Sequence, residues 1–402
     1  MLDLDKFIGE YVTERDESLF TPDIINSEAD LTERIKGKSV LVIGGAGSIG
    51  SSFIHAILPY RPASLTVVDL NENGLAELTR DLRSAQGTIV PEEYLTYTMD
   101  FDSEVFRRMF ITRGGYDIVA NFSAHKHVRS EKDKYSVQAL LENNVIKARR
   151  FMELLKKYPP KQFFCVSTDK AANPVNIMGA SKRVMEDLIM AYSKDFNVTT
   201  ARFANVAFSN GSLPAGFIER IMKRQPIAAP SDVRRYFVSP RESGQICMLA
   251  CILGKSGEVF FPKLKEEKMK KFSSIATDFL HSLGYEPHLC DSDEEAKLYA
   301  SQMPADTKEW PVVYFPSDTT GEKDYEEFYV EGEKIDLNRF SSLGVIEETT
   351  HRNPEEVDNF LHTLEGIFDN PDFTKSEVVA ALKNFLPNFV HEEKGKNLDQ
   401  KM

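Results

Sequence analysis

The stretch SVLVIGGAGSIG, from Ser39 to Gly50, decides the fold class of this chain. A short apolar run leads directly into glycines with the spacing Gly44-x-x-Gly47-x-x-Gly50. Glycines at such a turn let backbone N–H groups approach a pyrophosphate at the N-terminus of the next helix. The stretch therefore predicts a dinucleotide-binding unit, in which the cofactor contacts are Gly44, Gly47, Ser48, Ile49 and Gly50.

The next strand predicts which dinucleotide binds. LTVVDL carries Asp69 near its end, and a carboxylate in this place accepts hydrogen bonds from the adenosine ribose and repels a 2′-phosphate. No arginine follows in LNENG, from Leu70 to Gly74, so NAD is favoured over NADP. Asp100, after the third strand, is either an adenine contact or a solvated turn residue.

Apolar segments alternate with helical patterns through the first half of the chain. The expected strands lie in 39–45, 65–70, 94–100, 116–124, 161–167 and 198–203, and the clearest helices are Val137 to Tyr158 and Ala180 to Phe196. Near-continuous apolar strands separated by helices indicate a parallel sheet covered on both faces. We therefore predict an α/β fold with a Rossmann-type doubly wound parallel sheet, whose ligands bind beyond the carboxyl ends of the strands.

The same patterns divide the chain into three parts. Residues 1–36 form a polar arm, either solvated or docked on a partner subunit, and residues 37–205 form the dinucleotide-binding domain. Prolines then break the chain into short pieces, which indicates a smaller substrate-binding lobe over 206–402. This part ends in a helical extension, and some of its strands are free to return to the first domain.

Composition excludes several classes of protein. The formal charge of −13 argues against a nucleic-acid partner, and no apolar run approaches the ~20 residues that a membrane helix needs. The charged N-terminus lacks the apolar core of a signal peptide. Cys247 and Cys251 are one helical turn apart, but no second Cys or His pair lies nearby, so buried thiols without a metal are expected. We expect a cytoplasmic protein.

The candidate catalytic residues lie in the stretch STDKAANPVNIMGASKR, from Ser167 to Arg183. Asp169 and Lys170 stand side by side after an apolar strand, and Lys182 lies on the following helix. Four residues before Lys182, where many nucleotide-dependent oxidoreductases have a tyrosine, this chain has Met178. An adjacent acid and base are what an elimination step requires, because one proton must leave while another is donated.

These motifs resemble the nucleotide-sugar 4,6-dehydratases, which are extended short-chain dehydrogenases of bacterial surface-glycan pathways acting mainly on UDP-N-acetylglucosamine. The resemblance includes AHKHV at 124–128, RFANVAFSNGSLP at 202–214, RRYFVSPRESGQ from Arg234 and SDTTGEKDYEEFY from Ser317. It covers roughly 39–329, and the ending KNLDQKM is similar to the tail of a soluble subgroup.

The resemblance implies a role for each matching residue. Thr168 would hold the sugar 4-hydroxyl, with Asp169 as general acid and Lys170 as general base. Lys182 would orient the nicotinamide ribose, supported by Asn144. The other implied contacts are Ser123 and Ala124 for the cofactor, and Lys126, His127, Asn205, Ser212 and Arg235 for the substrate, Arg235 at its diphosphate.

The implied reaction also accounts for Met178. Hydride passes from sugar C4 to NAD, the resulting ketone acidifies the C5 proton, and hydride returns to C6 after water is eliminated, so tightly bound NAD is regenerated. Some members of the family carry methionine where others have tyrosine. Another group, such as Asp169 acting through Thr168, then takes the 4-hydroxyl proton.

Two other functions stay open on the sequence. A nucleotide-sugar 4-epimerase would share the fold and NAD but normally keeps the tyrosine, and a non-catalytic NAD sensor would be expected to lose Asp169 and Lys170.

By analogy with this fold, we expect a homo-oligomer paired through the helices at 137–158 and 180–196. The choice between uridine and guanosine in the substrate stays open.

Overall fold

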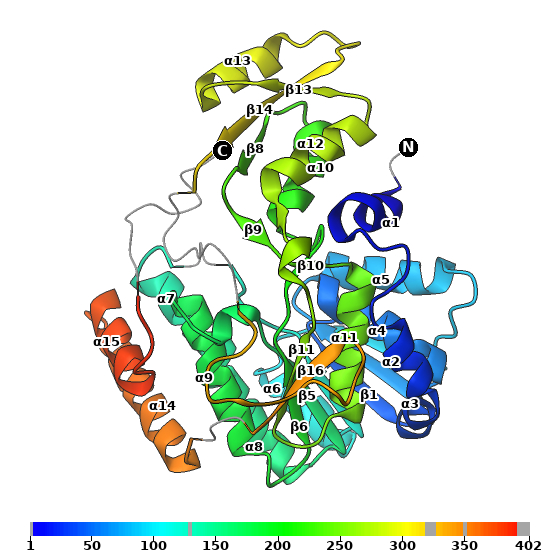
Figure 1. Ribbon diagram of the computed structural model, residues 1–402. Helices are drawn as coiled ribbons and strands as arrows, with labels where there is room; N and C mark the ends of the chain where they lie inside the picture. The colour runs from blue at the N-terminus through cyan, green and yellow to red at the C-terminus, as the bar shows by residue number, and fades with distance from the viewer. Residues whose placement is uncertain (1–2, 128–130, 318–326, 349–351, 392–402) are drawn as a thin grey trace.

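The computed structural model describes residues 3–127, 131–317, 327–348 and 352–391. They form a large α/β body and a smaller lobe above it (Figure 1). Val128, most of the motif from Ser317 to Tyr329, and the ending KNLDQKM lie outside the described residues.

The glycine-rich stretch forms the strand, turn and helix expected of it. Strand β1 (Ser39–Ile43) is buried and α4 (Ser48–Ile57) begins at the end of the turn. Gly44 has a φ of 73°, and a Cβ atom there would lie 2.7 Å from the backbone nitrogen of Ser123. Only glycine allows the turn to pass this close to the neighbouring strand.

The described residues build a nine-stranded sheet in the order β15-β16-β11-β6-β5-β4-β1-β2-β3. Its first six strands along the chain are β1, β2 (Ser64–Asp69), β3 (Glu93–Thr98), β4 (Ile118–Asn121), β5 (Gln162–Val166) and β6 (Val198–Ala201). They pair in parallel. The prediction of a doubly wound parallel sheet is confirmed, and the carboxyl ends of β1, β4 and β5 lie together at one edge.

Helices cover both faces of this sheet, as Figure 1 shows. In the described residues, those between β1 and β6 are α4, η2 (Leu58–Tyr60), α5 (Glu72–Ser84), α6 (Glu104–Thr112), α7 (Lys134–Leu141), η4 (Glu142–Ile146), α8 (Lys147–Lys157), η5 (Asp169–Ala171) and α9 (Ile177–Ala191). The helix expected at 137–158 is thus α7 and α8 joined by a π-helical turn, η4. That expected at 180–196 begins earlier, as α9.

Later parts of the chain return to the body. Helix α11 (Pro240–Leu253) packs against α4, and β11 (Glu258–Pro262) pairs in parallel with β6. Strands β16 (Leu343–Glu348) and β15 (Lys334–Asp336) extend the sheet in antiparallel pairing. The body therefore includes residues from well beyond 205.

The small lobe stands on the carboxyl edge of the sheet. It holds α10 (Leu213–Met222), β8 (Ile227–Pro230), β9 (Arg234–Arg235), β12 (Lys270–Lys271), α12 (Phe272–Ser282), β13 (Glu286–Leu289), α13 (Asp293–Gln302) and β14 (Glu309–Phe315). The short pairs β7 (Asn205–Val206) with β10 (Phe237–Val238), and β9 with β12, lie where this lobe joins the body.

The N-terminal arm packs on its own chain and is not a solvated extension. It forms α1 (Leu4–Phe7), η1 (Ile8–Thr13), α2 (Thr21–Asn26) and α3 (Glu28–Ile35). Phe7 packs against Phe208 and Phe279 of the small lobe, whereas Phe20 and Leu31 are buried in the body. Because apolar residues interrupt the polar arm at these points, it bridges lobe and body.

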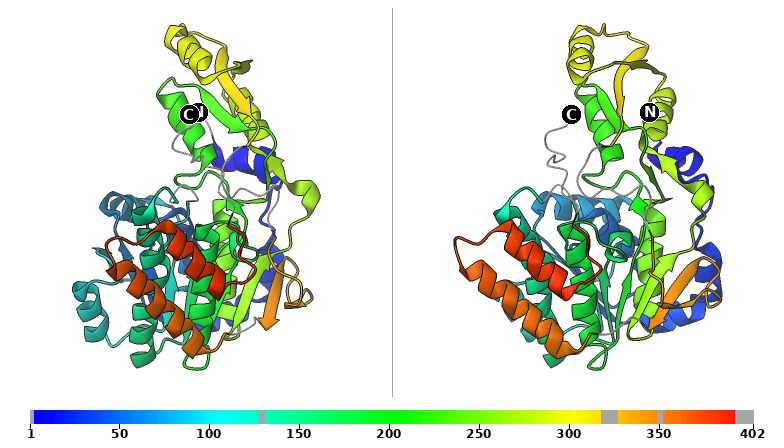
Figure 2. Two further views of the ribbon diagram at one scale, coloured as in Figure 1. Left: turned by 90° about the vertical axis from the view of Figure 1, so that its left-hand side faces the viewer. Right: turned by 60° about the vertical axis from the view of Figure 1, so that its left-hand side comes forward.

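The C-terminal extension forms a helical hairpin, α14 (Pro354–Asp369) and α15 (Lys375–Phe385). It lies across the helices α7 to α9 of its own chain (Figure 2). These are the helices for which pairing with a second subunit was predicted. In the structure the hairpin already covers part of that surface.

Candidate active-site cleft

Two neighbouring cavities open at the carboxyl edge of the sheet. One, of about 360 Å³, is bordered by the residues after β5 and by the small lobe. The other, of about 270 Å³, lies over the glycine turn. Ile49, Phe122, Ala124 and Lys126 line both, so the cavities form one cleft. The predicted cofactor residues lie mainly at one end, called the cofactor end below, and the predicted substrate residues at the other, called the substrate end.

The cofactor end has the features of a dinucleotide site. Helix α4 begins at Gly47 without a side-chain cap, so its first N–H groups are available to a phosphate. Gly44, Ser48 and Asp69 line this cavity. The Asp69 carboxylate also accepts a hydrogen bond from the backbone nitrogen of Ala46 at 3.0 Å, and thereby holds the glycine turn in place.

Of the predicted cofactor residues Asp100 and Asn144, only Asp100 lines this cavity; Asn144 is buried behind it, next to the lining residue Asn143. Asp100 lines the cavity and pairs with Lys147. Burial opposes ionisation of Asp100, but the contacts with Lys147 and the backbone of Asp102 outweigh it and lower its pKa. It is therefore an ion-paired residue rather than a solvated turn residue.

Asn144 lies in the π-helical turn η4, a distortion often found at functional sites. Its amide nitrogen donates to the Ser181 hydroxyl and to the backbone oxygen of His125, both at 3.0 Å. Its side-chain oxygen accepts from the His125 backbone. Asn144 thus reaches the residue before Lys182 and joins α9 to the loop after β4.

The reacting centre is compact. Thr168 Oγ1 donates to Asp169 Oδ1 at 2.8 Å, and Lys170 Nζ lies 3.1 Å from the same oxygen. Thr168 and Lys170 line the cavity, whereas Asp169 lies behind them and is 3% exposed. The predicted acid and base are therefore in direct contact, and the acid communicates with the cavity through its two neighbours.

Helix α9 brings Met178 and Lys182 to the same cavity. Lys182 is buried and its Nζ donates to the backbone oxygen of Val166 at 2.8 Å, and burial lowers its pKa. A Cβ atom on Gly179 would lie 2.6 Å from the backbone oxygen of Lys170. The glycine after Met178 therefore lets α9 approach the loop that carries the acid and base.

The predicted substrate residues line the other side. They are Lys126, His127, Asn205, Ser212 and Arg235. Lys126 Nζ donates to the backbone oxygen of Asn210 at 3.0 Å. Asn210 in turn donates its N–H to the Ser48 hydroxyl at 2.8 Å, so the loop after β7 crosses from the substrate end to the glycine turn.

Sequence reasoning missed two groups of residues at this cleft. The first is an aromatic wall formed by Phe122, Phe203, Phe237 and Phe272; single aromatic residues in apolar segments carry no signal for it. The second lies under Ser167, whose hydroxyl donates to Glu186 at 2.5 Å. Glu186 is paired with the buried Arg202, which holds the pKa of that carboxyl low despite its burial.

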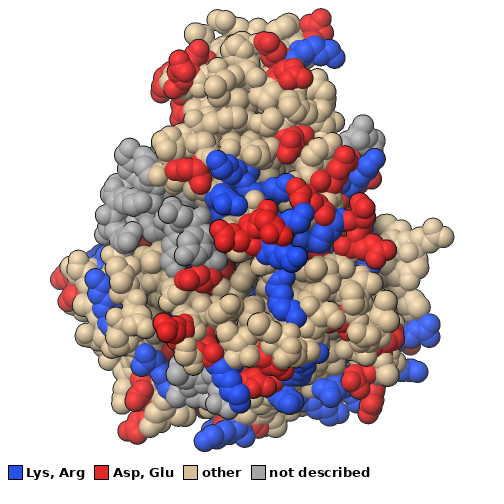
Figure 3. Space-filling view, viewed as in Figure 1, with Lys and Arg blue, Asp and Glu red and all other residues tan. Residues whose placement is uncertain are grey.

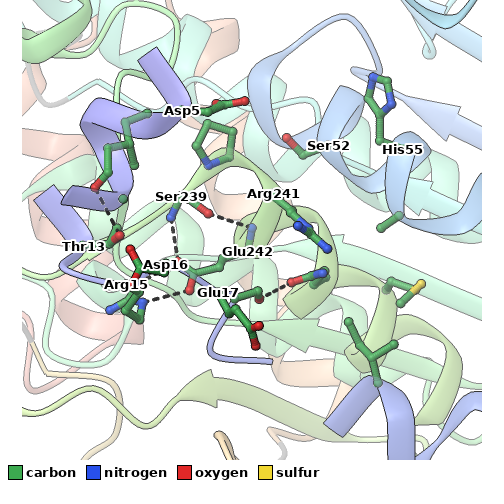
Figure 4. Close-up of a pocket in the computed structure, with 18 of the residues that line it drawn as sticks. Asp5, Thr13, Arg15, Asp16, Glu17, Ser52, His55, Ser239, Arg241 and Glu242 are labelled. Carbon is green, nitrogen blue, oxygen red and sulfur yellow. Dashed lines mark hydrogen bonds and ion pairs between the residues drawn. The ribbon is translucent and has the colours of Figure 1, made fainter. Parts of the chain in front are cut away.

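A larger cavity, of about 630 Å³, lies between the N-terminal arm and the helices α4 and α11 (Figure 4). None of the predicted site residues lines it. Its Arg15 side chain is bound to Glu242 and to the backbone oxygen of Phe237, and Glu242 also caps α11. These polar side chains hold the N-terminal arm on the body. The larger volume of this cavity therefore does not make it the candidate active site.

Charged side chains of both signs are exposed near the cleft. On the face seen in Figure 3, basic and acidic side chains are interspersed, and many lie where the small lobe meets the body. In the ion pairs between arm and lobe, Glu14 contacts Lys268 and Lys270.

The sequence matches the family described as polysaccharide biosynthesis protein over residues 40–348, a range that includes the glycine turn, the acid–base pair and both ends of the cleft. The chain belongs to this family. The resemblance predicted from the motifs is confirmed at this level.

The relatives differ in how much of their own length aligns with this chain. An uncharacterized membrane protein of Methanocaldococcus jannaschii is 29% identical over 79% of this chain and 88% of its own. The probable polysaccharide biosynthesis protein EpsC of Bacillus subtilis is 29% identical over 64% of this chain, which spans only 42% of it. A UDP-N-acetylglucosamine 4,6-dehydratase (inverting) of Campylobacter jejuni is 24% identical over 61% of this chain and 73% of its own.

Epimerases and solved structures are also similar. A UDP-glucose 4-epimerase of Rickettsia canadensis is 26% identical over 81% of this chain and 96% of its own. The structure of Pen from Bacillus thuringiensis superposes with a TM-score of 0.62 at 22% identity, covering 82% of this chain and 98% of Pen. This likeness establishes the fold. Among the helices of the described residues, none combines the length and the apolar character that a membrane span requires.

Proposed function

We propose that this protein is an NAD-dependent 4,6-dehydratase that acts on a nucleotide-activated amino sugar, UDP-N-acetylglucosamine, in surface-glycan biosynthesis. The observation that carries the proposal is the contact between Lys170 Nζ and Asp169 Oδ1, 3.1 Å apart at the carboxyl end of β5. The similarity to the Campylobacter jejuni dehydratase supports the substrate.

The two groups divide the proton transfers of the elimination between them. Asp169 takes the proton of the 4-hydroxyl by way of Thr168 and becomes a carboxylic acid, while Lys170 acts as a neutral amine. Lys170 removes the proton from sugar C5, and the proton of Asp169 passes by way of Thr168 to the departing 6-hydroxyl, which leaves as water. Lys170 then returns its proton to C5, so both groups regain the states in which they began.

The first proton transfer needs a group other than Met178, which lines the cavity but has no proton to exchange. Thr168 Oγ1 already donates to Asp169 at 2.8 Å. A 4-hydroxyl bound at Thr168 therefore has a path for its proton to Asp169, and this path replaces the tyrosine of other members of the fold.

The cofactor residues fit NAD. These residues would hold NAD, which would supply the hydride chemistry at C4 and C6 without consumption of an external oxidant. The uncapped start of α4 suits its pyrophosphate, the Asp69 carboxylate at the cavity edge disfavours a 2′-phosphate, and Lys182 lies beside the reacting centre. Lys126, His127 and Arg235 supply positive charge or donors for the substrate diphosphate.

The test is proton NMR of the purified protein mixed with UDP-N-acetylglucosamine in deuterated water, without added NAD. We expect a 4-keto-6-deoxy product with deuterium at C5, because Lys170 exchanges its protons with solvent while it holds the C5 proton. An unchanged sugar, with the GDP-linked analogue equally inert, would rule out the dehydratase.

The second candidate is a nucleotide-sugar 4-epimerase, which the similarity to the Rickettsia canadensis enzyme favours. The same spectra distinguish the two, because an epimerase yields a C4 epimer that keeps its 6-hydroxyl and takes no deuterium at C5. An NAD-sensing protein without activity would bind the cofactor and leave both sugars unchanged.

A further inference from the structure

The C-terminal hairpin, α14 and α15, lies beyond the range 40–348 that matches the family, yet it reaches the reacting centre. Phe360, Leu361, Leu382 and Phe385 are buried in the same apolar cluster as Val184 and Leu188 of α9. Two ion pairs, Arg149 with Asp358 and Arg352 with Asp187, connect α14 and the residues just before it to α8 and α9. Figure 2 shows the hairpin lying flat along these helices.

The hairpin also holds one residue of the body, Glu131. Lys375 Nζ donates to the backbone oxygen of Glu131 at 3.2 Å, and His391 Nε2 lies 3.4 Å from Glu131 Oε2. The side chains of Glu131 and His391 are 5% and 6% exposed. Contacts from two places beyond the family range therefore fix both the backbone and the carboxylate of Glu131.

The other carboxylate oxygen of Glu131 is directed at the active-site helix. Glu131 Oε1 accepts a hydrogen bond from the backbone nitrogen of Met178 at 2.9 Å, and Asn176 accepts one from Gly179 at 2.7 Å. A carboxylate at a helix N-terminus is stabilised both by the hydrogen bond and by the helix dipole. The first turn of α9 is thus held from outside the helix.

The position of this turn determines where the residues of the site lie. Met178 is held by packing in the apolar cluster, because its thioether is at best a weak hydrogen-bond acceptor, and Gly179 follows it at close contact with the Lys170 backbone. Lys182, one turn further on, depends on the same helix for its place. A small displacement here would move Lys182 relative to the acid–base pair, and misplacement of about 1 Å can cost on the order of 100-fold in rate.

We propose that Glu131, held by Lys375 of the C-terminal hairpin and by His391 of the segment after α15, is a positioning residue that fixes the first turn of α9. The C-terminal region thereby contributes to the placement of this helix. The effect on turnover rests on the proposed dehydratase function. The effect on the backbone of α9 does not.

Hydrogen–deuterium exchange of the peptide containing Met178 and Gly179 tests the backbone contact directly. We compare Glu131→Ala, Glu131→Gln and His391→Ala with Asp358→Asn, which breaks a hairpin ion pair 3.0 Å long elsewhere. In Glu131→Ala we expect exchange at this turn at least about tenfold faster, because the Met178 N–H loses its acceptor. Glu131→Gln keeps an acceptor oxygen and should recover most of the protection. His391→Ala should show a smaller change in the same direction, and Asp358→Asn none.

Kinetics on the same variants provide the second readout. Glu131→Ala should lower kcat about tenfold or more with KM changed less than about threefold, since the sugar contacts remain. Equal effects of Asp358→Asn and Glu131→Ala would overturn the proposal, because the hairpin would then act only on general stability. Unchanged exchange and kcat in Glu131→Ala would overturn it too.

If Glu131→Ala does not fold, the milder variants Glu131→Gln and His391→Ala still decide the matter. Wild-type protein that makes no keto product would defeat the proposed function and leave the exchange experiment valid. The two failures are therefore distinguishable.

Discussion

The inner end and the outer side of α9 meet different surroundings. At the inner end, Gly179 lies against the backbone of Lys170 and Met178 borders the cavity, so atoms are fixed by close approach and hydrogen bonds. On the outer side, Val184 and Leu188 pack against α14 and Asp187 pairs with Arg352. The inner end depends on the exact identity of a few residues, whereas the outer side depends on buried area and balanced charge.

The largest effect on the dehydration rate is expected from removing the amine group of Lys170 near the inner end. Lys170→Met removes the group that we propose takes the C5 proton, and the dehydration rate should fall by about 10²–10⁴-fold. Deuterium incorporation at C5, followed by NMR, measures it. The control is Lys157→Met on the exposed face of α8, and equal loss in both variants would contradict the assignment.

Next in size is a steric change at the same end. Gly179→Ala places a Cβ atom 2.6 Å from the backbone oxygen of Lys170, so backbone must shift. The free energy of unfolding should fall by about 1–3 kcal/mol, with a loss of turnover as the acid–base loop moves. Urea denaturation checks the first and the NMR assay the second; wild-type values for both would mean that the approach is looser than described.

On the outer side, a pH-dependent effect is expected at Asp187. Burial raises the pKa of Asp187 to about 6, against the pull of Arg183 and Arg352. The folded state thus binds this proton more tightly than the unfolded chain, whose aspartates titrate near pH ~4. The stability gained from the proton is present below that pH and is lost as the pH rises through about 6.

Asp187→Asn removes this titration. The difference in unfolding free energy, wild type minus variant, should fall by about 2 kcal/mol between pH ~4 and ~7. Urea denaturation at several pH values measures it. A difference that stays level or rises with pH would show that the two arginines keep this carboxyl ionised throughout.

The smallest change in the free energy of unfolding is expected at Gly366, which differs from Gly179 in having open space around it. Gly366 on α14 is exposed, and a Cβ atom there would meet nothing within 4 Å. Gly366→Ala should therefore raise the free energy of unfolding by about 0.5–1 kcal/mol, through helix propensity alone, and leave turnover unchanged. Destabilisation would mean that the hairpin has a contact at this residue.

The sequence predicted the parts of this molecule that depend on local pattern. The apolar run before Gly44 predicts β1, the phosphate turn and α4, because the spacing of a few neighbouring residues determines all three. Asp169 and Lys170 are neighbours in the chain, so their contact could be expected as well. The two ends of the cleft follow from the rule that the carboxyl ends of parallel strands meet.

Contacts between distant segments could not be predicted in this way. Arg15 pairs with Glu242, 227 residues away, and His391 approaches Glu131 across 260 residues. In the run SEKDK, from Ser130, Glu131 reads as one charge of a solvated loop. Helical periodicity indicates that α14 and α15 exist, but the surface on which they dock is decided by shape and charge that no short window contains.

The hairpin has a consequence for how this protein can change over evolutionary time. When two identical subunits cover each other, each substitution appears on both sides of the interface at once. Here α9 is covered by α14, a different segment of the same chain. A mutation in α14 therefore alters only one side of the contact, and a second mutation in α9 can compensate for it. The helix that carries Met178 and Lys182 can therefore adapt to its outer neighbour without a symmetric change elsewhere.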